Sequence, residues 1–174
     1  MPDKHPDGIV DKSLVELAGR NWLASQLFRA GLEVARPERD RGIDLIAYLD
    51  MDNSGSFIAC PIQMKAASKA VFSLFPKYER FHDLILAYVW NVETPSHTTC
   101  FALTYPEAYR VAETMGYTKR KSWTHGVGPN QLRGWTTTKP SDSLRELLAP
   151  YEMNTNKWRD KIARSHNSRV DSKD

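Results

Sequence analysis

Two apolar runs joined by a strong turn constrain the fold of this chain more than any other feature. The runs span residues 43–50 and 57–65, and the segment Asp52-Asn53-Ser54-Gly55-Ser56 between them has the composition of a turn. Apolar runs of this length, bounded by turn residues, are typical of strands, so we predict a β-hairpin. Pro61 in the second run has no N–H to donate, which favours an edge position or a bulge for that strand.

Helical and strand patterns surround this hairpin. Apolar residues between 14 and 28 recur at helical spacing, after a cap at Asp11 or Ser13 and before a C-cap at Gly31. We further predict strands over 33–36, 83–91 and 98–103, a short helix or turn over 77–82, helices over 105–115, 141–148 and 154–165, and an irregular segment over 117–140. This order of elements indicates an α/β fold with a central mixed β-sheet of four to five strands flanked by helices.

Length and composition are those of one globular domain. The chain has 174 residues, of which 41% are hydrophobic and 26% charged. We expect a flexible N-terminus over 1–10, a single domain over 11–150, and a C-terminal helix with a basic tail over 151–174. The net charge of +3 permits a nucleic-acid partner without indicating one.

No secretory signal and no apolar run long enough to cross a membrane are present in the sequence. We therefore expect a soluble, cytoplasmic protein with no membrane partner. Cys60 and Cys100 both lie in apolar runs, and in a reducing compartment free buried thiols are expected rather than a disulfide.

Three polar side chains interrupt the apolar strands of the hairpin. Asp44 lies in the first strand, and Gln63 and Lys65 lie two residues apart in the second, so the latter two point to one face. If the strands pair as a hairpin, Asp44 can lie beside both of them. Because a buried charge without a partner is costly, these residues indicate a site.

The three residues have the chemistry of a divalent-cation site. Asp44 offers an anionic oxygen, Gln63 an amide oxygen and Met64 a backbone carbonyl. Mg²⁺ (or Mn²⁺) suits such a partial set of oxygens, because it keeps several waters and also binds phosphate. Lys65 would then orient or deprotonate an attacking water, or neutralise charge developing on a phosphate.

A leading helix, a strand with Asp44 and a strand with Gln63-x-Lys65 together resemble the PD-(D/E)XK nuclease superfamily, in the Gln-x-Lys variant of Mrr-like restriction enzymes. The resemblance covers roughly residues 11–92. A closer resemblance, which names no substrate, is to bacterial proteins with the strand sequences Gly-Ile-Asp-Leu-Ile and Ile-Gln-Met-Lys, found here at 42–46 and 62–65.

This resemblance implies a restriction-endonuclease-like core and metal-dependent hydrolysis of phosphodiester bonds, most readily in DNA. Asp44, Gln63 and Lys65 would be the catalytic residues, with Asp44, Gln63 and Met64 as metal ligands. It further implies a role in bacterial defence, and many members of the superfamily act as homodimers. Whether this chain forms a homodimer is open.

Two departures from the family pattern favour a different interpretation. The family often carries a Glu just after a Gly on its first helix, but here Arg20 follows Gly19. Glu16, one turn earlier, is a candidate for the additional catalytic acid, or else forms an i,i+4 surface pair with Arg20. Gln63 is neutral where a carboxylate would bind a cation more strongly. The alternative function is therefore that of a catalytically degenerate nuclease-fold protein that binds nucleic acid or a protein partner.

Each residue of the proposed site also has a purely structural interpretation. Asp44 could accept backbone hydrogen bonds at the start of a strand, Gln63 could satisfy a sheet edge, and Lys65 could extend its amine to solvent. The joint occurrence of all three in one predicted hairpin favours the nuclease-type site.

Basic and aromatic residues suggest where a nucleic acid would bind. Candidates for contacts with phosphates are Lys69 and Lys77 beside the motif strand, and Lys119, Arg120 and Lys121 next to Trp123. A solvated loop anchored by Trp123 is the alternative. The aromatic residues expected in the core are Trp22, Phe28, Tyr88 and Trp90, and those expected at the surface are Trp135 and Trp158.

Overall fold

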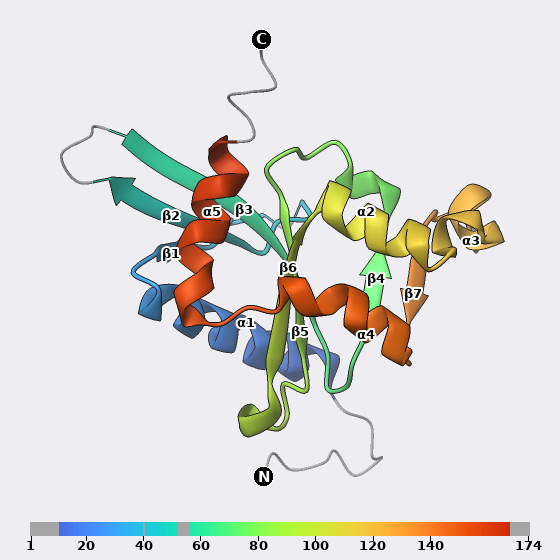
Figure 1. Cartoon of the computed structure of the whole chain (residues 1–174), viewed down its shortest axis with the longest axis horizontal. Coiled ribbons are helices and arrows are strands. Elements are labelled where there is room, and N and C mark those ends of the chain that lie inside the picture. The colour runs from blue at the N-terminus through green and yellow to red at the C-terminus, as the bar shows by residue number, and fades with distance from the viewer. Residues whose placement is uncertain (1–10, 40, 52–55, 168–174) are drawn as a thin grey trace.

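A five-stranded mixed sheet forms the centre of the molecule (Figure 1), in a computed structural model that describes residues 11–39, 41–51 and 56–167. Its spatial order is β1-β2-β3-β5-β6. β3 and β5 run parallel, and the other neighbours are antiparallel. The strands are β1 (Glu33–Ala35), β2 (Leu45–Met51), β3 (Ser56–Ala66), β5 (Ile85–Trp90) and β6 (Thr99–Thr104). The predicted α/β fold with a mixed central sheet is confirmed.

Helices cover both faces of this sheet. On one face α1 and α5 pack together over β3 and its neighbours, and on the other face α2, α4 and a small second sheet enclose a separate apolar core. The helices are α1 (Lys12–Arg29), α2 (Tyr105–Thr114), α3 (Lys121–Thr124), α4 (Asp142–Leu148) and α5 (Trp158–Asn167). Single 3₁₀ turns are η1 (Pro76–Tyr78), η2 (Pro95–His97), η3 (Tyr117–Lys119), η4 (Ala149–Tyr151) and η5 (Thr155–Lys157). Among the described residues, no helix has the length and apolar character needed to span a membrane.

The predicted hairpin is formed by β2 and β3, which pair antiparallel with Leu45 opposite Ile62. Its turn, residues 52–55, lies outside the described residues. The edge position inferred from Pro61 is wrong for the strand as a whole, because β3 lies between β2 and β5. Pairing with β5 begins only at Ile62, however, so Pro61 lies where β3 has β2 as its single described neighbour. A missing N–H is tolerated at that position because it interrupts no pairing with β5.

The first helix begins as predicted and approaches the sheet closely. Asp11 caps it by accepting a hydrogen bond of 2.8 Å from the backbone N–H of Ser13. At Gly19 a Cβ atom would overlap the side chain of Ala66, so the absence of a side chain lets α1 contact the end of β3.

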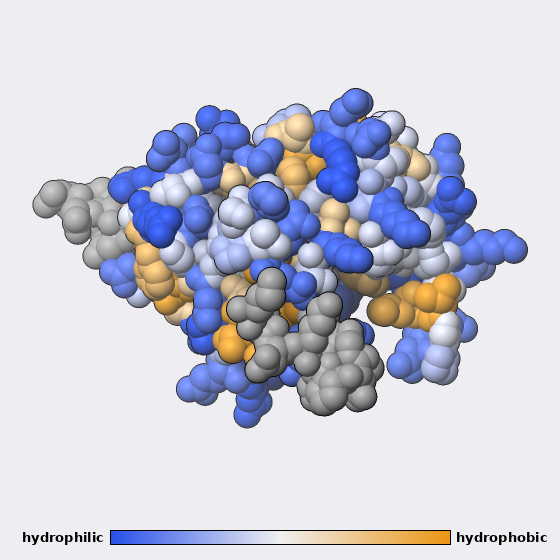
Figure 2. Space-filling view, turned by 90° about the horizontal axis from the view of Figure 1, so that it is seen from below, coloured by the Kyte–Doolittle hydropathy of each residue, from blue (hydrophilic) through white to orange (hydrophobic). Residues whose placement is uncertain are grey.

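Part of the apolar surface of α1 faces solvent, contrary to the interpretation of its spacing. Phe28, expected in the core, is 57% exposed, and Leu14 and Leu17 are also exposed. Leu23 and Leu27 on the opposite side of the helix supply the buried contacts. Viewed from below, the side on which α1 lies, the surface is mostly hydrophilic with separate apolar areas (Figure 2).

Two further predictions about the C-terminal third were wrong. Residues 117–140 are not wholly irregular, since they contain α3 and the strand β7 (Trp135–Thr137), which pairs antiparallel with β4 (Phe72–Leu74) in a second sheet. Trp158, expected at the surface, is 0% exposed and packs with Ile162 of α5 into the core beneath the main sheet. Trp135 is half-buried and stacks on the ring of Tyr117.

The two cysteines are free and buried, as predicted. Burial raises the pKa of the Cys60 thiol to about 12, and burial also raises that of Cys100. Both thiols are therefore protonated at neutral pH and act as small apolar side chains rather than as nucleophiles.

Candidate functional site

Alternation along β3 separates the polar residues of the motif from the core. Ile62 and Met64 point into the apolar core shared with α1 and α5. Gln63 and Lys65 point to the opposite face, where both line a cavity beside η1. The prediction that Gln63 and Lys65 share one face is therefore confirmed.

Asp44 is in direct contact with Gln63, the buried polar residue that lines this cavity. The Asp44 Oδ2 atom accepts hydrogen bonds from the Gln63 Nε2 amide and, at 2.6 Å, from the backbone N–H of Met64. The same Gln63 Nε2 also donates to the Met64 carbonyl at 3.1 Å, and Gln63 is only 6% exposed. On its other side Gln63 Oε1 accepts a hydrogen bond of 3.3 Å from the Tyr78 hydroxyl. Every polar atom of this buried amide thus has a partner.

Gly42 lets the chain pass close to this group. It has a φ of +88°, a conformation that L side chains rarely adopt, and it lines the same cavity. A Cβ atom there would lie 3.6 Å from both Gln63 Oε1 and the Tyr78 ring. These are ordinary van der Waals distances, so it is the positive φ rather than lack of space that favours glycine here, two residues before Asp44.

Cations dominate the rim of the cavity. It has a volume of about 380 Å³, and Arg41, Lys65, Lys77 and Arg80 line it together with Gly42, Gln63, Tyr78 and Phe81. The amines of Lys65 and Lys77 lie 5.6 Å and 5.0 Å from the centroid of the Tyr78 ring, within the range of cation–π attraction. An anion entering the cavity would meet four positive side chains, whereas the half-buried carboxylate of Asp44 contacts Gln63 and is not among the described residues that line the cavity.

The oxygens that meet at Gln63 fit a divalent cation as a partial ligand set. Asp44 Oδ2 and the Met64 carbonyl both contact Gln63 Nε2, so the amide nitrogen lies where these two oxygens converge. Rotating the amide by half a turn would bring Gln63 Oε1 to that point, and the Tyr78 hydroxyl can accept as well as donate a hydrogen bond. No group of three or more His, Cys, Asp or Glu side chains suited to a metal ion occurs in the part of the chain that the structure describes. The set therefore offers three oxygens and one formal negative charge.

Glu16, the candidate additional acid, lies apart from these residues. It forms an ion pair with Arg20 on α1, and its side chain is 56% exposed. Helix α1 packs against the face of β3 opposite to Gln63, and Glu16 is not among the described residues that line the cavity. The surface pair with Arg20, one of the two alternatives, is the arrangement present.

The candidate nucleic-acid contacts fall into two groups. Lys77 lines the cavity, whereas Lys69 is exposed outside it. Trp123 is buried against Tyr109, which leaves it no free face to stack on a base. The exposed cations beside that tryptophan are Lys119, Arg120 and Lys121, and the Arg120 guanidinium lies 5.5 Å from the Trp135 ring centroid.

Sequence reasoning missed three residues of the cavity, Arg41, Tyr78 and Arg80. Arg41 directly precedes the Gly-Ile-Asp motif and could have been proposed from that proximity. Tyr78 and Arg80 reach the site because η1 folds back over β3, and no local pattern signals that path. No protein-family model, curated protein or solved structure matches this chain.

Proposed function

We propose that this protein is a metal-dependent nuclease of the PD-(D/E)XK type that hydrolyses phosphodiester bonds, most readily in DNA. The observation that carries the proposal is the convergence of Asp44 and the Met64 carbonyl on Gln63, which lines a cavity with four cationic side chains. Cationic side chains suit a phosphodiester, and oxygens suit Mg²⁺ or Mn²⁺. The cavity and the oxygens that meet at Gln63 thus combine the two requirements of phosphoryl hydrolysis.

The residues have distinct roles in this proposal. Asp44, Gln63 and the Met64 carbonyl would hold the cation, which when bound supplies Lewis-acid catalysis and an activated water. Lys65 shares the face of Gln63 and would either orient the water or neutralise charge developing on the phosphate. Arg41 and Arg80 on the rim would hold non-bridging phosphate oxygens, for which guanidinium groups are well shaped.

A second candidate function is binding of nucleic acid without cleavage, on the same fold. The observation in its favour is that Asp44 and Gln63 already satisfy each other, and that Asp44 brings the only formal negative charge to the oxygen set. Glu16, which would have added a second charge, is paired with Arg20. The cationic rim would serve a binding protein equally well.

Cleavage of a mixed panel of substrates tests the proposal. The panel contains linear duplex, supercoiled plasmid, single-stranded and branched DNA, and RNA, each with Mg²⁺, Mn²⁺ or EDTA. Lys65→Ala should abolish cleavage, a loss of at least about 10²-fold, while the protein stays folded, because the change removes a charge and little core volume. Lys12→Ala is the matched control, since Lys12 is an exposed lysine on α1, which packs against the face of β3 opposite to the cavity.

Three outcomes separate the candidates. Metal-dependent cleavage that is lost in Lys65→Ala and kept in Lys12→Ala supports the nuclease. Binding of nucleic acid without cleavage of any substrate supports the second candidate. Equal cleavage by the wild-type protein and Lys65→Ala would overturn the assignment of the motif.

A further inference from the structure

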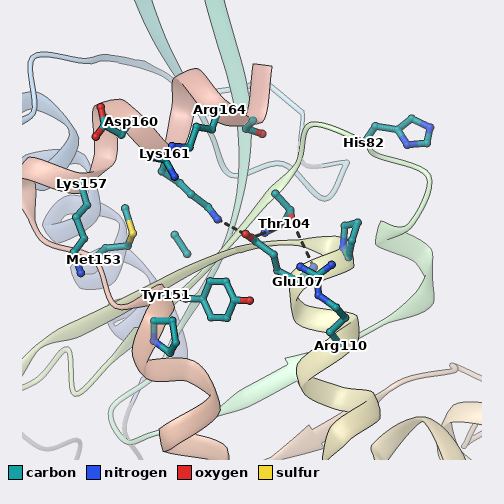
Figure 3. A pocket seen from close by; sticks show the side chains of 14 residues that line it. His82, Thr104, Glu107, Arg110, Tyr151, Met153, Lys157, Asp160, Lys161 and Arg164 are labelled. Atoms are coloured by element: carbon teal, nitrogen blue, oxygen red, sulfur yellow. Dashed lines mark hydrogen bonds and ion pairs between the residues drawn. The ribbon is translucent and has the colours of Figure 1, made fainter. Parts of the chain in front are cut away.

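A second cavity of about 530 Å³ lies between α2, η4, α5 and the loop before β5 (Figure 3). Four cationic side chains line it: Arg110 from α2, Lys157 from η5, and Lys161 and Arg164 from α5. Figure 3 shows the α5 side chains on one side of the cavity and Glu107 with Arg110 of α2 on the other. His82 of the loop and the half-buried ring of Tyr151 also line the cavity.

One ion pair in this cavity is structural. Lys161 Nζ lies 2.6 Å from Glu107 Oε2, and that carboxylate also accepts a 2.7 Å hydrogen bond from the Thr104 N–H as part of the capping box of α2. Burial alone would raise the pKa of Glu107, but the hydrogen bonds from Lys161 and Thr104 outweigh it and lower the pKa. Glu107 and Lys161 therefore neutralise each other, and neither charge is left for a ligand.

The remaining charges leave a positive surplus. Arg110 and Arg164 are exposed, and among the described residues neither has a carboxylate within 4.0 Å. Lys157 donates to the backbone carbonyl of Glu152 at 2.8 Å, a neutral partner that leaves its charge uncompensated. Asp160 is the one other acid lining the cavity. Three cations therefore stand against one acid once the Glu107 pair is set aside.

The two cavities border the same loop. Arg80 and Phe81 line the first cavity, and the next residue, His82, lines the second. This loop leads into β5, whose first residue Ile85 pairs with Thr104 at the end of β6, and Thr104 also lines the second cavity. A chain of negative charges held in the first cavity can therefore continue across the loop into the second.

We propose that the second cavity binds a backbone phosphate of the same nucleic-acid strand whose scissile phosphate lies in the first cavity. This inference rests on the proposed function and adds to it a path for the strand over residues 80–82. Exposed cations on opposite walls suit a polyanion, which binds by releasing counterions. A small phosphorylated ligand would instead require buried polar groups directed at it.

Binding of oligonucleotides of two lengths tests this path. The full-length protein is titrated in EDTA with fluorescent single strands of about 4 and about 16 nucleotides, the range of site sizes for single-strand binding. Arg110→Ala/Arg164→Ala removes two exposed cations of the second cavity. The control, Arg29→Ala/Arg159→Ala, also removes two exposed cations, but near the C-terminal end of α1, where the Arg159 guanidinium lies close to Gly31.

The test variant should bind the long strand about tenfold more weakly and the short strand as the wild-type protein does. The slope of log K against log salt should fall by about 1.4 for the long strand, because each lost contact with a single strand removes about 0.7. The control should leave the binding of both lengths unchanged.

Several results would overturn the path. They are an equal loss for both lengths, no loss for either, the same loss in the control, or no binding by the wild-type protein. Inorganic phosphate that binds the wild-type protein and not the test variant, with long-strand binding unchanged, would assign the cavity to a small ligand. If the proposed path fails, the nuclease proposal can still be tested separately. It is supported if the test variant cleaves the short strand and Lys65→Ala does not.

Discussion

The cavity at Gln63 contains a buried polar side chain as well as exposed cations, whereas the available cations of the cavity between α2 and α5 are all exposed. At the first, Gln63 is almost fully buried, and Asp44 accepts hydrogen bonds from its amide and from the Met64 N–H. In the second, Glu107 is partly buried, takes part in the capping box of α2 and pairs with Lys161. The remaining cations of that cavity are exposed.

This difference in burial between the polar groups of the two cavities indicates a different role for each cavity. Buried and fixed dipoles act strongly on charge that develops beside them, because little solvent screens them and they need no reorganisation. Exposed cations are screened by salt and contribute little individually, but they add up along a polyanion. The first cavity is therefore suited to chemistry and the second to positioning a long substrate.

The largest effect is expected from Asp44→Ala. The change leaves the Met64 N–H without its acceptor and the Gln63 amide with the Met64 carbonyl as its remaining acceptor, which should lower the free energy of unfolding by about 1–3 kcal/mol. Cleavage and Mn²⁺ binding should both be lost, as measured by gel assay and calorimetric titration. Denaturant unfolding at the assay temperature checks that the variant is folded. Unchanged metal binding in a folded Asp44→Ala protein would remove Asp44 from the ligand set.

A smaller effect, opposite in sign for metal binding, is expected from Gln63→Glu. A second carboxylate beside Asp44 should raise the affinity for Mg²⁺ or Mn²⁺ by about tenfold or more. Without metal the two like charges repel, so unfolding in EDTA should require about 1–2 kcal/mol less than in the wild-type protein, and added Mg²⁺ should restore it. If the unfolding free energy of Gln63→Glu does not change when Mg²⁺ is added, no cation binds between these residues.

Much of the fold could be predicted because its signals are local. The cap at Asp11, the hairpin of β2 and β3, and the helix capped by Ser141 each depend on residues near one another in the sequence. The pairing of β4 with β7 joins two three-residue strands about 60 residues apart, too short for any periodicity to reveal. The burial of Trp158 did have a signal, since Trp158, Ile162 and Ser165 recur at helical spacing and all three are buried.

The candidate site was predictable to the same extent. Alternation places Gln63 and Lys65 on one face, and the hairpin register brings Asp44 to Gln63. Tyr78 and Arg80 depend on how the loop after β4 returns over β3, which is tertiary information. The second cavity is lined by residues of α2, α5 and the segments beside them, and the prediction of a C-terminal helix with a basic tail could not show which cations have partners.

Removing the hydroxyl that holds Gln63 should have a moderate effect. Tyr78→Phe deletes the donor to Gln63 Oε1 and should cost about 1 kcal/mol of stability, with a several-fold fall in kcat as the amide loses its orientation. Tyr88→Phe is the matched control, because its buried hydroxyl donates to the Ser73 carbonyl instead. It should cost similar stability and leave kcat unchanged. Equal losses of kcat in both variants would mean that Tyr78 acts only through stability.

The smallest effect, and the sharpest contrast with Asp44, is expected at Glu107. Its folded-state pKa is lowered, so its ionised form contributes stability above the ordinary carboxyl pKa of about 4.3, and this contribution is lost as the pH falls through the folded-state pKa. The difference in unfolding free energy between wild type and Glu107→Gln should be constant above about pH 5.5 and shrink below it.

The size of the Glu107 effect should be below about 1 kcal/mol, because the pair with Lys161 is partly solvated. Glu113→Gln, an exposed position on the same helix, is the control and should follow the wild-type curve. Binding of the long strand by Glu107→Gln should be equal or tighter, since Lys161 then gains a free charge. Weaker binding would mean that the carboxylate positions Lys161 for the strand, and the second cavity would then resemble the first in depending on a fixed buried group.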